Sequence, residues 1–201
     1  MSPESDVPVI QFPLRGEWYA LPTPGHSDEE WDLTRLRRGR LTTKGWLRHL
    51  FTRVPADSFY AWGQPIFAPF DGVVTRAHDG EPDHDQINLV RGLIRVSKGT
   101  VSNHVLLESD GVFALLVHFE RGSVQVETGE AVQEGQLLGR VGNSGRSWFP
   151  HLHMQLMDGP DFTKARLLPF KVKEIEHKQG KGWKKMNGDG LTKGGTYRFP
   201  A

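Results

Sequence analysis

The sequence predicts an all-β fold in which short antiparallel strands form a sheet or a sandwich. Gly 23 and Pro 13 together make about 18% of the 201 residues, above the roughly 12% of average usage, which favours frequent turns over long helices. Between Phe59 and Met157, turn signals recur about every 8–12 residues, as is typical of closed or sandwiched antiparallel sheets. Residues 150–157 alternate apolar and polar side chains, as a strand with one buried face does.

The expected strands follow one another around short turns. Residues 66–80 predict two strands around a Phe-Asp-Gly turn at 70–72. Residues 103–119 predict a hairpin that closes at a Ser-Asp-Gly turn at 109–111. Residues 123–142 predict further short strands separated by glycines. The central part of the chain therefore contains most of the predicted sheet.

The chain is expected to form one domain over residues 1–201, with its core at about 59–158. Residues 1–58 are irregular in pattern because prolines interrupt any long element. In the C-terminal part, 159–201, residues 169–186 alternate enough for one or two more strands, and a basic Gly/Lys-rich tail is expected after them. No internal repeat and no second domain are predicted.

A basic insertion precedes the predicted core. Residues 35–53 contain seven Lys or Arg and no acidic residue. Apolar positions in the second half of this segment predict a short amphipathic helix. Two interpretations stay open, a solvated face of a loop-and-helix insertion or a contact with an anionic polymer or a membrane surface. The pattern favours the solvated face.

Charge, cysteine content and hydropathy exclude several classes of function. Lys+Arg 25 against Asp+Glu 24 gives a net charge of +1, so no nucleic-acid partner is expected. With Cys 0, disulfides, iron–sulfur clusters and thiol catalysis are excluded, and any metal must bind to His and carboxylates. The longest purely apolar run, 112–117, predicts no transmembrane segment. Residues 1–10 lack the basic and apolar regions of an export signal, so none is expected in this chain, and the compartment stays open.

The most informative segment is residues 150–157, with the sequence PHLHMQLM. In a strand, Leu152 would face the core, while His151 and His153 would share the opposite face about 6.5 Å apart. This arrangement suits one His as a metal ligand and the other beside a metal-bound water or the substrate. The alternative is two surface histidines on an edge strand.

Three more residues extend this hypothesis. His118 ends an apolar strand, where a titratable ring is either satisfied by a hydrogen bond or placed next to a site. His26 and Asp32 flank an acidic turn and, with His153, would supply the three N/O ligands of a hydrolytic zinc site. His118 and His151 would then take the proton and hold the developing oxyanion. The spacing alone does not bring these five residues together.

The sequence resembles the lysostaphin-type (LytM-like) zinc metallopeptidases, which cut cell-wall peptides. The resemblance runs through residues 60–80 and 103–159, and its most specific part is GNSGRSWFPHLHMQL at 142–156. It implies a compact antiparallel β-structure of the duplicated hybrid motif type. It also implies an endopeptidase that hydrolyses peptide bonds of peptidoglycan or Gly-rich peptides with a metal-activated water, and a location in the cell envelope or outside the cell.

The resemblance assigns roles to the five residues. It implies that His26, Asp32 and His153 bind one zinc ion per chain, and that His118 and His151 are catalytic. Two of the implied ligands lie in the N-terminal segment, where five residues separate His26 from Asp32, a spacing that differs from the tight three-residue spacing of many members. The basic insertion has no clear counterpart in the family.

Other functions remain as alternatives at this stage. A non-catalytic module that binds the cell wall or regulates a hydrolase could use the same scaffold. By fold analogy alone, IFAPFDGVV and LLVHF also resemble sugar-phosphotransferase phosphocarriers, in which His118 would accept phosphate. Among the other histidines, His78 is expected at the surface, and His104 is expected to be structural or to line a groove.

Overall fold

The computed structural model describes residues 7–44, 53–85, 102–186 and 188–199. The prediction of an all-β fold is confirmed: the described residues form fifteen strands and one short 3-10 helix, η1 (Ala56–Ser58). All strand pairs are antiparallel except one, the parallel pair of β1 (Val9–Ile10) and β12 (Lys171–Val172). In the part of the chain that the structure describes, no helix is both long and apolar enough to cross a membrane.

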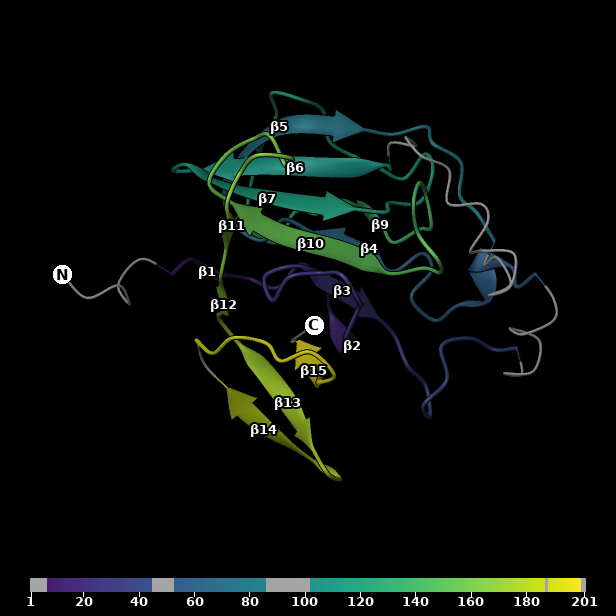
Figure 1. Cartoon of the computed structure of the whole chain (residues 1–201). Coiled ribbons are helices and arrows are strands. Elements are labelled where there is room, and N and C mark those ends of the chain that lie inside the picture. The colour runs from purple at the N-terminus through teal and green to yellow at the C-terminus, as the bar shows by residue number, and fades with distance from the viewer. Residues whose placement is uncertain (1–6, 45–52, 86–101, 187, 200–201) are drawn as a thin grey trace.

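One sheet of eleven strands dominates the molecule (Figure 1). Ten of them lie in the order β14-β13-β15-β2-β3-β10-β7-β6-β5-β8, and β11 pairs with β10. A separate two-stranded sheet joins β4 (Pro65–Phe67) to β9 (Leu137–Arg140). The strands of the main sheet are β2 (Gly16–Leu21), β3 (Trp31–Thr34), β5 (Gly72–His78), β6 (His104–Ser109), β7 (Val112–Val117), β8 (Ala131–Val132), β10 (Leu152–Met157), β11 (Leu167–Leu168), β13 (Ile175–Gln179), β14 (Gly182–Met186) and β15 (Thr196–Phe199).

The predicted hairpin is the pair β6 and β7. Ser109 lies opposite Val112, which leaves Asp110 and Gly111 as a two-residue loop. Both loop residues have positive φ, 48° and 78°, and an Asp-Gly pair of this kind gives the turn whose twist matches antiparallel strands. The predicted turn at 70–72 likewise separates β4 from β5.

The alternation predicted for β10 is also observed. Leu152, Met154 and Leu156 are all 0% exposed and belong to the main core, while His153 and Gln155 point to the other face. Burying each of these apolar side chains stabilises the fold by about 1.5–3 kcal/mol. The alternative of an edge strand is excluded, because β10 lies between β3 and β7.

The C-terminal region differs from the prediction. In place of a basic tail, β15 pairs with β2 and with β13. Tyr197 and Phe199 of β15 are buried in the core, and the ring of Phe199 stacks on Phe12 with centroids 3.8 Å apart. The apolar residues that the sheet buries alternate here with basic ones. The basic composition of this region therefore suggested a tail where the structure has a strand.

The basic insertion is described only in part. Residues 35–44 contain no helix; they form a turn in which Arg37 and Arg40 make a β-bridge. The predicted helix falls mainly on residues 45–52, which lie outside the described residues. Several cations of the segment have partners within the fold: Arg35 lies over the Trp18 ring, Arg37 over Tyr60, and Arg53 pairs with Asp85 at 3.0 Å. Contact with an anionic polymer or membrane surface stays a prediction.

Candidate metal centre

Two strands that are distant in the sequence place Asp32 against His153. β3 and β10 are antiparallel neighbours, and Asp32 is directly opposite His153, so both side chains leave the same face of the sheet. His153 Nδ1 lies 2.8 Å from Asp32 Oδ1. The carboxylate is only 4% exposed and also accepts a hydrogen bond of 2.6 Å from the Thr23 hydroxyl at Oδ2. Asp32 is therefore held from two sides.

His26 approaches the same carboxylate from the loop between β2 and β3. Its Nδ1 lies 3.2 Å from Asp32 Oδ2, and its ring meets the His153 ring edge-on with centroids 5.1 Å apart. The turn between His26 and Asp32 is closed by a hydrogen bond of 2.8 Å from the Ser27 amide to a Glu30 carboxylate oxygen. The unusual five-residue spacing between His26 and Asp32 is thus compatible with their contact.

His26, Asp32 and His153 suit a metal ion. Their ligand atoms lie within 4.8 Å of one another, and no other group of three such side chains in the described residues does so. His26 Nδ1 is buried, and its 3.2 Å contact with Asp32 is not a hydrogen bond, so this nitrogen is available to bind an ion. Two imidazoles and one carboxylate are the N/O ligand set of a catalytic zinc site, which keeps a fourth position open. The residues present therefore fit zinc.

The charges of this cluster are coupled. Burial would raise the pKa of Asp32, yet hydrogen bonds and the charges of His151 and His153 lower it far below its usual range. Burial would lower the pKa of His153, but its contacts with Asp32 and a 3.1 Å contact with Gln155 raise it. The carboxylate is therefore ionised at neutral pH and attracts positive charge to this spot.

His118 lies beside the cluster at the end of β7. It has a φ of 70°, a left-handed conformation that residues other than glycine adopt rarely and that often marks functional sites. Its Nδ1 donates a 2.8 Å hydrogen bond to the Ser144 carbonyl, which leaves Nε2 as the free nitrogen. Burial and the neighbouring His151 hold the pKa of His118 well below its usual value, so the ring is neutral.

His151 completes the group from the residues before β10. Its Nδ1 lies 2.7 Å from the Phe149 carbonyl and 3.2 Å from the Ser147 hydroxyl, while its Nε2 lies 3.4 Å from Asp32 Oδ1. The rings of His151 and His118 are 4.7 Å apart. The preceding loop depends on Gly145, which has a φ of 68° and whose Cβ would collide with the Ser102 side chain. A larger residue there would displace the loop.

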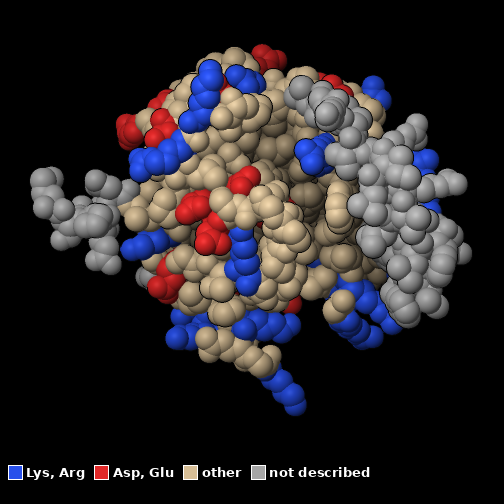
Figure 2. Space-filling view, in the orientation of Figure 1, with Lys and Arg blue, Asp and Glu red and all other residues tan. Residues whose placement is uncertain are grey.

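The structure brings together all five residues predicted from the sequence. It adds side chains that orient them. Gln155 could have been found from the sequence, because it lies two residues after His153 on the same face of a strand. The side chains of Thr23 and Ser147 and the backbone carbonyl of Ser144 also contact the five residues from loops, and no spacing in the sequence indicates this. The surface seen in Figure 2 is hollowed to the right of its centre, over the ends of β6, β7 and β10.

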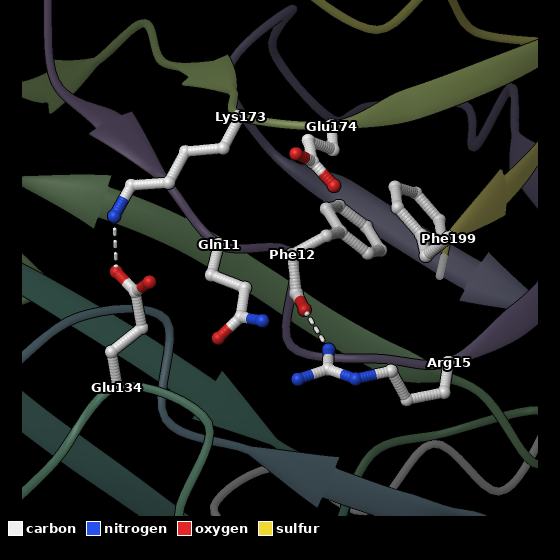
Figure 3. A pocket seen from close by; sticks show the side chains of 7 residues that line it. All are labelled: Gln11, Phe12, Arg15, Glu134, Lys173, Glu174 and Phe199. Carbon is white, nitrogen blue, oxygen red and sulfur yellow. Dashed lines mark hydrogen bonds and ion pairs between the residues drawn. The ribbon is translucent and has the colours of Figure 1, made fainter. Parts of the chain in front are cut away.

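A separate cavity of about 270 Å³ is lined by none of the five residues. Figure 3 shows its lining, with Phe12 and Phe199 on one side and Arg15 on the other. Arg15 donates a 2.8 Å hydrogen bond to the Phe12 carbonyl, and Lys173 pairs with Glu134 at 2.6 Å. Arg15 is bonded to a backbone carbonyl, and the charges of Lys173 and Glu134 offset each other, so this cavity does not compete with the histidine cluster as a reaction site.

Comparison with known proteins identifies the class. Residues 56–164 match the sequence profile of peptidase family M23, and this match covers more than half of the chain. The chain therefore belongs to peptidase family M23, in agreement with the resemblance to LytM-like peptidases. No curated protein sequence matches it.

Three solved structures illustrate the similarity. The catalytic domain of lysostaphin from Staphylococcus simulans is 20% identical, with 79% of this chain and 86% of that chain covered and a TM-score of 0.42. A mutant catalytic domain of the prophage-encoded M23 protein EnpA from Enterococcus faecalis is 20% identical, with 80% and 92% covered and a TM-score of 0.45. LytU is 18% identical, with 83% and 86% covered and a TM-score of 0.40.

Proposed function

We propose that the protein is a zinc-dependent endopeptidase that hydrolyses peptide bonds of peptidoglycan or of Gly-rich peptides. The observation that carries this proposal is the convergence of five residues at one end of the sheet. His26, Asp32 and His153 would hold one zinc ion, and His118 and His151 lie next to them. Membership of a peptidase family supports hydrolysis of a peptide bond. The envelope or the exterior of the cell is the matching location.

The metal would supply Lewis-acid chemistry, because a zinc ion in such a site makes water acidic near pH 7 and polarises a peptide carbonyl. The protein supplies the ligands and their orientation. Thr23 holds one oxygen of Asp32 by its 2.6 Å hydrogen bond, so the carboxylate cannot rotate freely. Such outer contacts keep ligands in place and tune the affinity for the metal.

His118 is the residue best placed to accept a proton. Its Nδ1–H is committed to the Ser144 carbonyl, and its burial keeps the ring neutral, so Nε2 carries a lone pair. General-base catalysis of this kind contributes about 10²–10⁴-fold to a rate. The same nitrogen can later return the proton to the amine that leaves when the peptide bond breaks.

His151 is suited to stabilise negative charge on the substrate. Its Nδ1 is held by the Phe149 carbonyl, and its Nε2 points to the centre, 3.4 Å from Asp32 Oδ1. A protonated ring presents an N–H at Nε2, which can donate to the oxygen of the substrate carbonyl as charge develops there. In this proposal His118 is the general base, and His151 is the hydrogen-bond donor to the oxyanion.

The test measures zinc and hydrolysis together. The purified protein is dialysed against metal-free buffer, its zinc is determined by elemental analysis, and release of dye from labelled peptidoglycan is followed. We expect one retained zinc per chain in the wild type, loss of that zinc in His153→Ala, and retained zinc without hydrolysis in His151→Ala. His177→Gln serves as a matched control, because His177 of β13 stacks on Tyr197 of β15, two strands that contain none of the five residues.

Two outcomes would overturn the proposal. A wild-type protein that retains no zinc, even after zinc is added back, would show that the three side chains do not act as ligands. A protein that retains zinc and binds peptidoglycan without cutting it would instead be a non-catalytic binding module on the M23 scaffold.

A further inference from the structure

The candidate metal centre lies on one continuous row of paired residues that crosses five strands. Asp32 of β3 is opposite His153 of β10, His153 is opposite Val117 of β7, Val117 is opposite His104 of β6, and His104 is opposite His78 of β5. These strands lie side by side in Figure 1. Directly opposed residues of antiparallel strands point to the same face, so His104 and His78 share the face of the metal centre.

His104 has an unused ring nitrogen in a buried position. Its Nδ1 donates a 2.8 Å hydrogen bond to the Ser102 carbonyl, which leaves the lone pair on Nε2. Nε2 is buried and has no hydrogen-bond partner in the described structure, and the residue as a whole is only 7% exposed. Buried polar atoms are normally satisfied, so this nitrogen calls for an explanation.

His78 offers a second nitrogen of the same kind. Its ring stacks on that of His104 with centroids 5.5 Å apart and an interplanar angle of 27°. Its Nε2 is also buried and makes no hydrogen bond within the described residues. The sequence alone indicated a surface position, whereas the pairing of β5 with β6 brings this ring against a buried one.

A carboxylate is fixed next to the two rings. Glu81 Oε1 lies 3.6 Å from His78 Nε2. The backbone of Glu81 is clamped by the fully buried Asn103, whose side-chain oxygen accepts from the Glu81 amide at 2.9 Å and whose side-chain nitrogen donates to the Glu81 carbonyl at 3.0 Å. Asn103 immediately precedes His104, so this residue links the backbone of Glu81 to the start of β6.

We propose that His78, Glu81 and His104 form a second cation site, which takes a divalent ion of the zinc class. Two imidazole nitrogens and a carboxylate oxygen are ligands that zinc accepts. The bond from His104 Nδ1 to a carbonyl is the outer contact that fixes the tautomer of a metal-binding His. The site uses none of the five residues of the first centre, and it lies about 10 Å from His153 along the row, two strand spacings away.

The second site binds more weakly than the first. Its three donor atoms are less closely gathered, since only those of His26, Asp32 and His153 lie within 4.8 Å of one another in the described residues. The positive charge of Arg76, two residues before His78 on β5, also acts on His104. The side chains of His78 and Glu81 are 37% and 35% exposed, which gives them room to close on an ion. Zinc at this site therefore exchanges during dialysis and is detected in the presence of free zinc.

Equilibrium dialysis of the full chain against zinc alone tests the proposal. We expect two zinc ions per chain in the wild type, one in His153→Ala, one in His78→Gln, and none in the protein with both changes. His78→Gln is preferred to a change at the buried His104, because a partly exposed residue can be replaced without loss of the fold. His177→Gln is the matched control and should bind two ions. Zinc should also raise the unfolding temperature of His153→Ala but not that of the double variant.

The two proposals fail in distinguishable ways. One zinc per chain in the wild type, lost in His153→Ala and kept in His78→Gln, would overturn the second site and leave the proposed function intact. Binding of two zinc ions per chain by His78→Gln would also overturn the second site. One zinc per chain that is lost in His78→Gln but kept in His153→Ala would support the second site and contradict the first.

Discussion

The row from Asp32 to His78 has two halves that differ in the carboxylate beside their rings. At the inner half, the buried Asp32 lies 2.8 Å from His153 Nδ1 and 3.4 Å from Nε2 of the adjacent His151. At the outer half, the partly exposed Glu81 lies 3.6 Å from His78 Nε2, and the buried Nε2 of His104 makes no hydrogen bond in the described structure. Both halves lie on the same face of the same sheet. The difference shows that strand register alone can place imidazoles on one face of a sheet. A buried carboxylate is needed to bring their nitrogen atoms close together.

The largest effect is expected when the inner half loses its charge. In Asp32→Asn the side chain keeps its shape, but a neutral amide is a poor zinc ligand and no longer attracts His151 and His153. We expect loss of the dialysis-resistant zinc and a fall of more than about 100-fold in peptidoglycan hydrolysis, since even outer contacts cost about 10–100-fold. Elemental analysis and dye release measure the two quantities.

The matched control for this change is Asp161→Asn, because Asp161 is exposed and its carboxylate contacts Thr163 and Lys164, neither of which belongs to the five residues. This variant should keep its zinc and its activity. Retention of zinc by Asp32→Asn would remove the contrast between the two halves.

A change at His118 separates chemistry from metal binding. His118→Gln removes the nitrogen that would accept the proton, while the three ligands stay in place. We expect kcat to fall by about 10²–10⁴-fold with little change in KM and with zinc retained. Steady-state kinetics on a soluble wall peptide, with zinc content measured on the same sample, checks this. An unchanged kcat would show that another group accepts the proton.

A smaller effect is expected for the residue that orients the carboxylate. Thr23→Val removes the hydroxyl that donates to Asp32 at nearly constant side-chain volume, so zinc affinity should weaken by about 10–100-fold. Competition with a zinc chelator measures the affinity. Thr163→Val, at an exposed position, is the control and should leave the affinity as in the wild type. Equal affinities in both variants would mean that Asp32 needs no such support.

The smallest effect concerns the outer half without metal. Burial lowers the pKa of His104 in the folded protein, whereas the unfolded chain has the ordinary value near 6.5. Below about pH 6.5 the unfolded state therefore binds more protons, and the stability falls as the pH falls, by at most about 1.4 kcal/mol per pH unit for this group. Urea unfolding with a chelator at pH 7.5 and pH 5.5 should show a smaller difference in His104→Gln than in the wild type. An equal difference would mean that His104 is protonated freely in the folded state.

Local patterns in the sequence predicted the central strands and the five residues of the candidate centre. The alternation in 150–157 predicted β10, and the Asp-Gly pair predicted the turn between β6 and β7, because both signals depend on neighbouring residues. The roles of His26 and Asp32 came from ligand chemistry and from the family resemblance. Their metal binding is still a prediction, although the structure places them as the prediction requires.

Long-range pairing is what the sequence did not reveal. The C-terminal strand β15 was missed because its partner β2 lies near the other end of the chain and the intervening composition is basic. The pairing of His104 with His78 was missed for a related reason, since the register of β5 against β6 depends on the whole sheet and includes an irregularity between Val74 and Arg76. No local rule relates two histidines that are distant in the sequence.

The hydrogen bond between Asp32 and His153 joins residues 121 positions apart in the chain. Contacts of such long sequence separation form late and slowly in folding, because a large loop must close before they repay its entropy. We therefore expect that the proposed ligand set is incomplete until β3 and β10 pair, so that a metal ion would bind only after the sheet has formed. The rate at which added zinc becomes resistant to a chelator during refolding would then measure how fast the complete sheet forms.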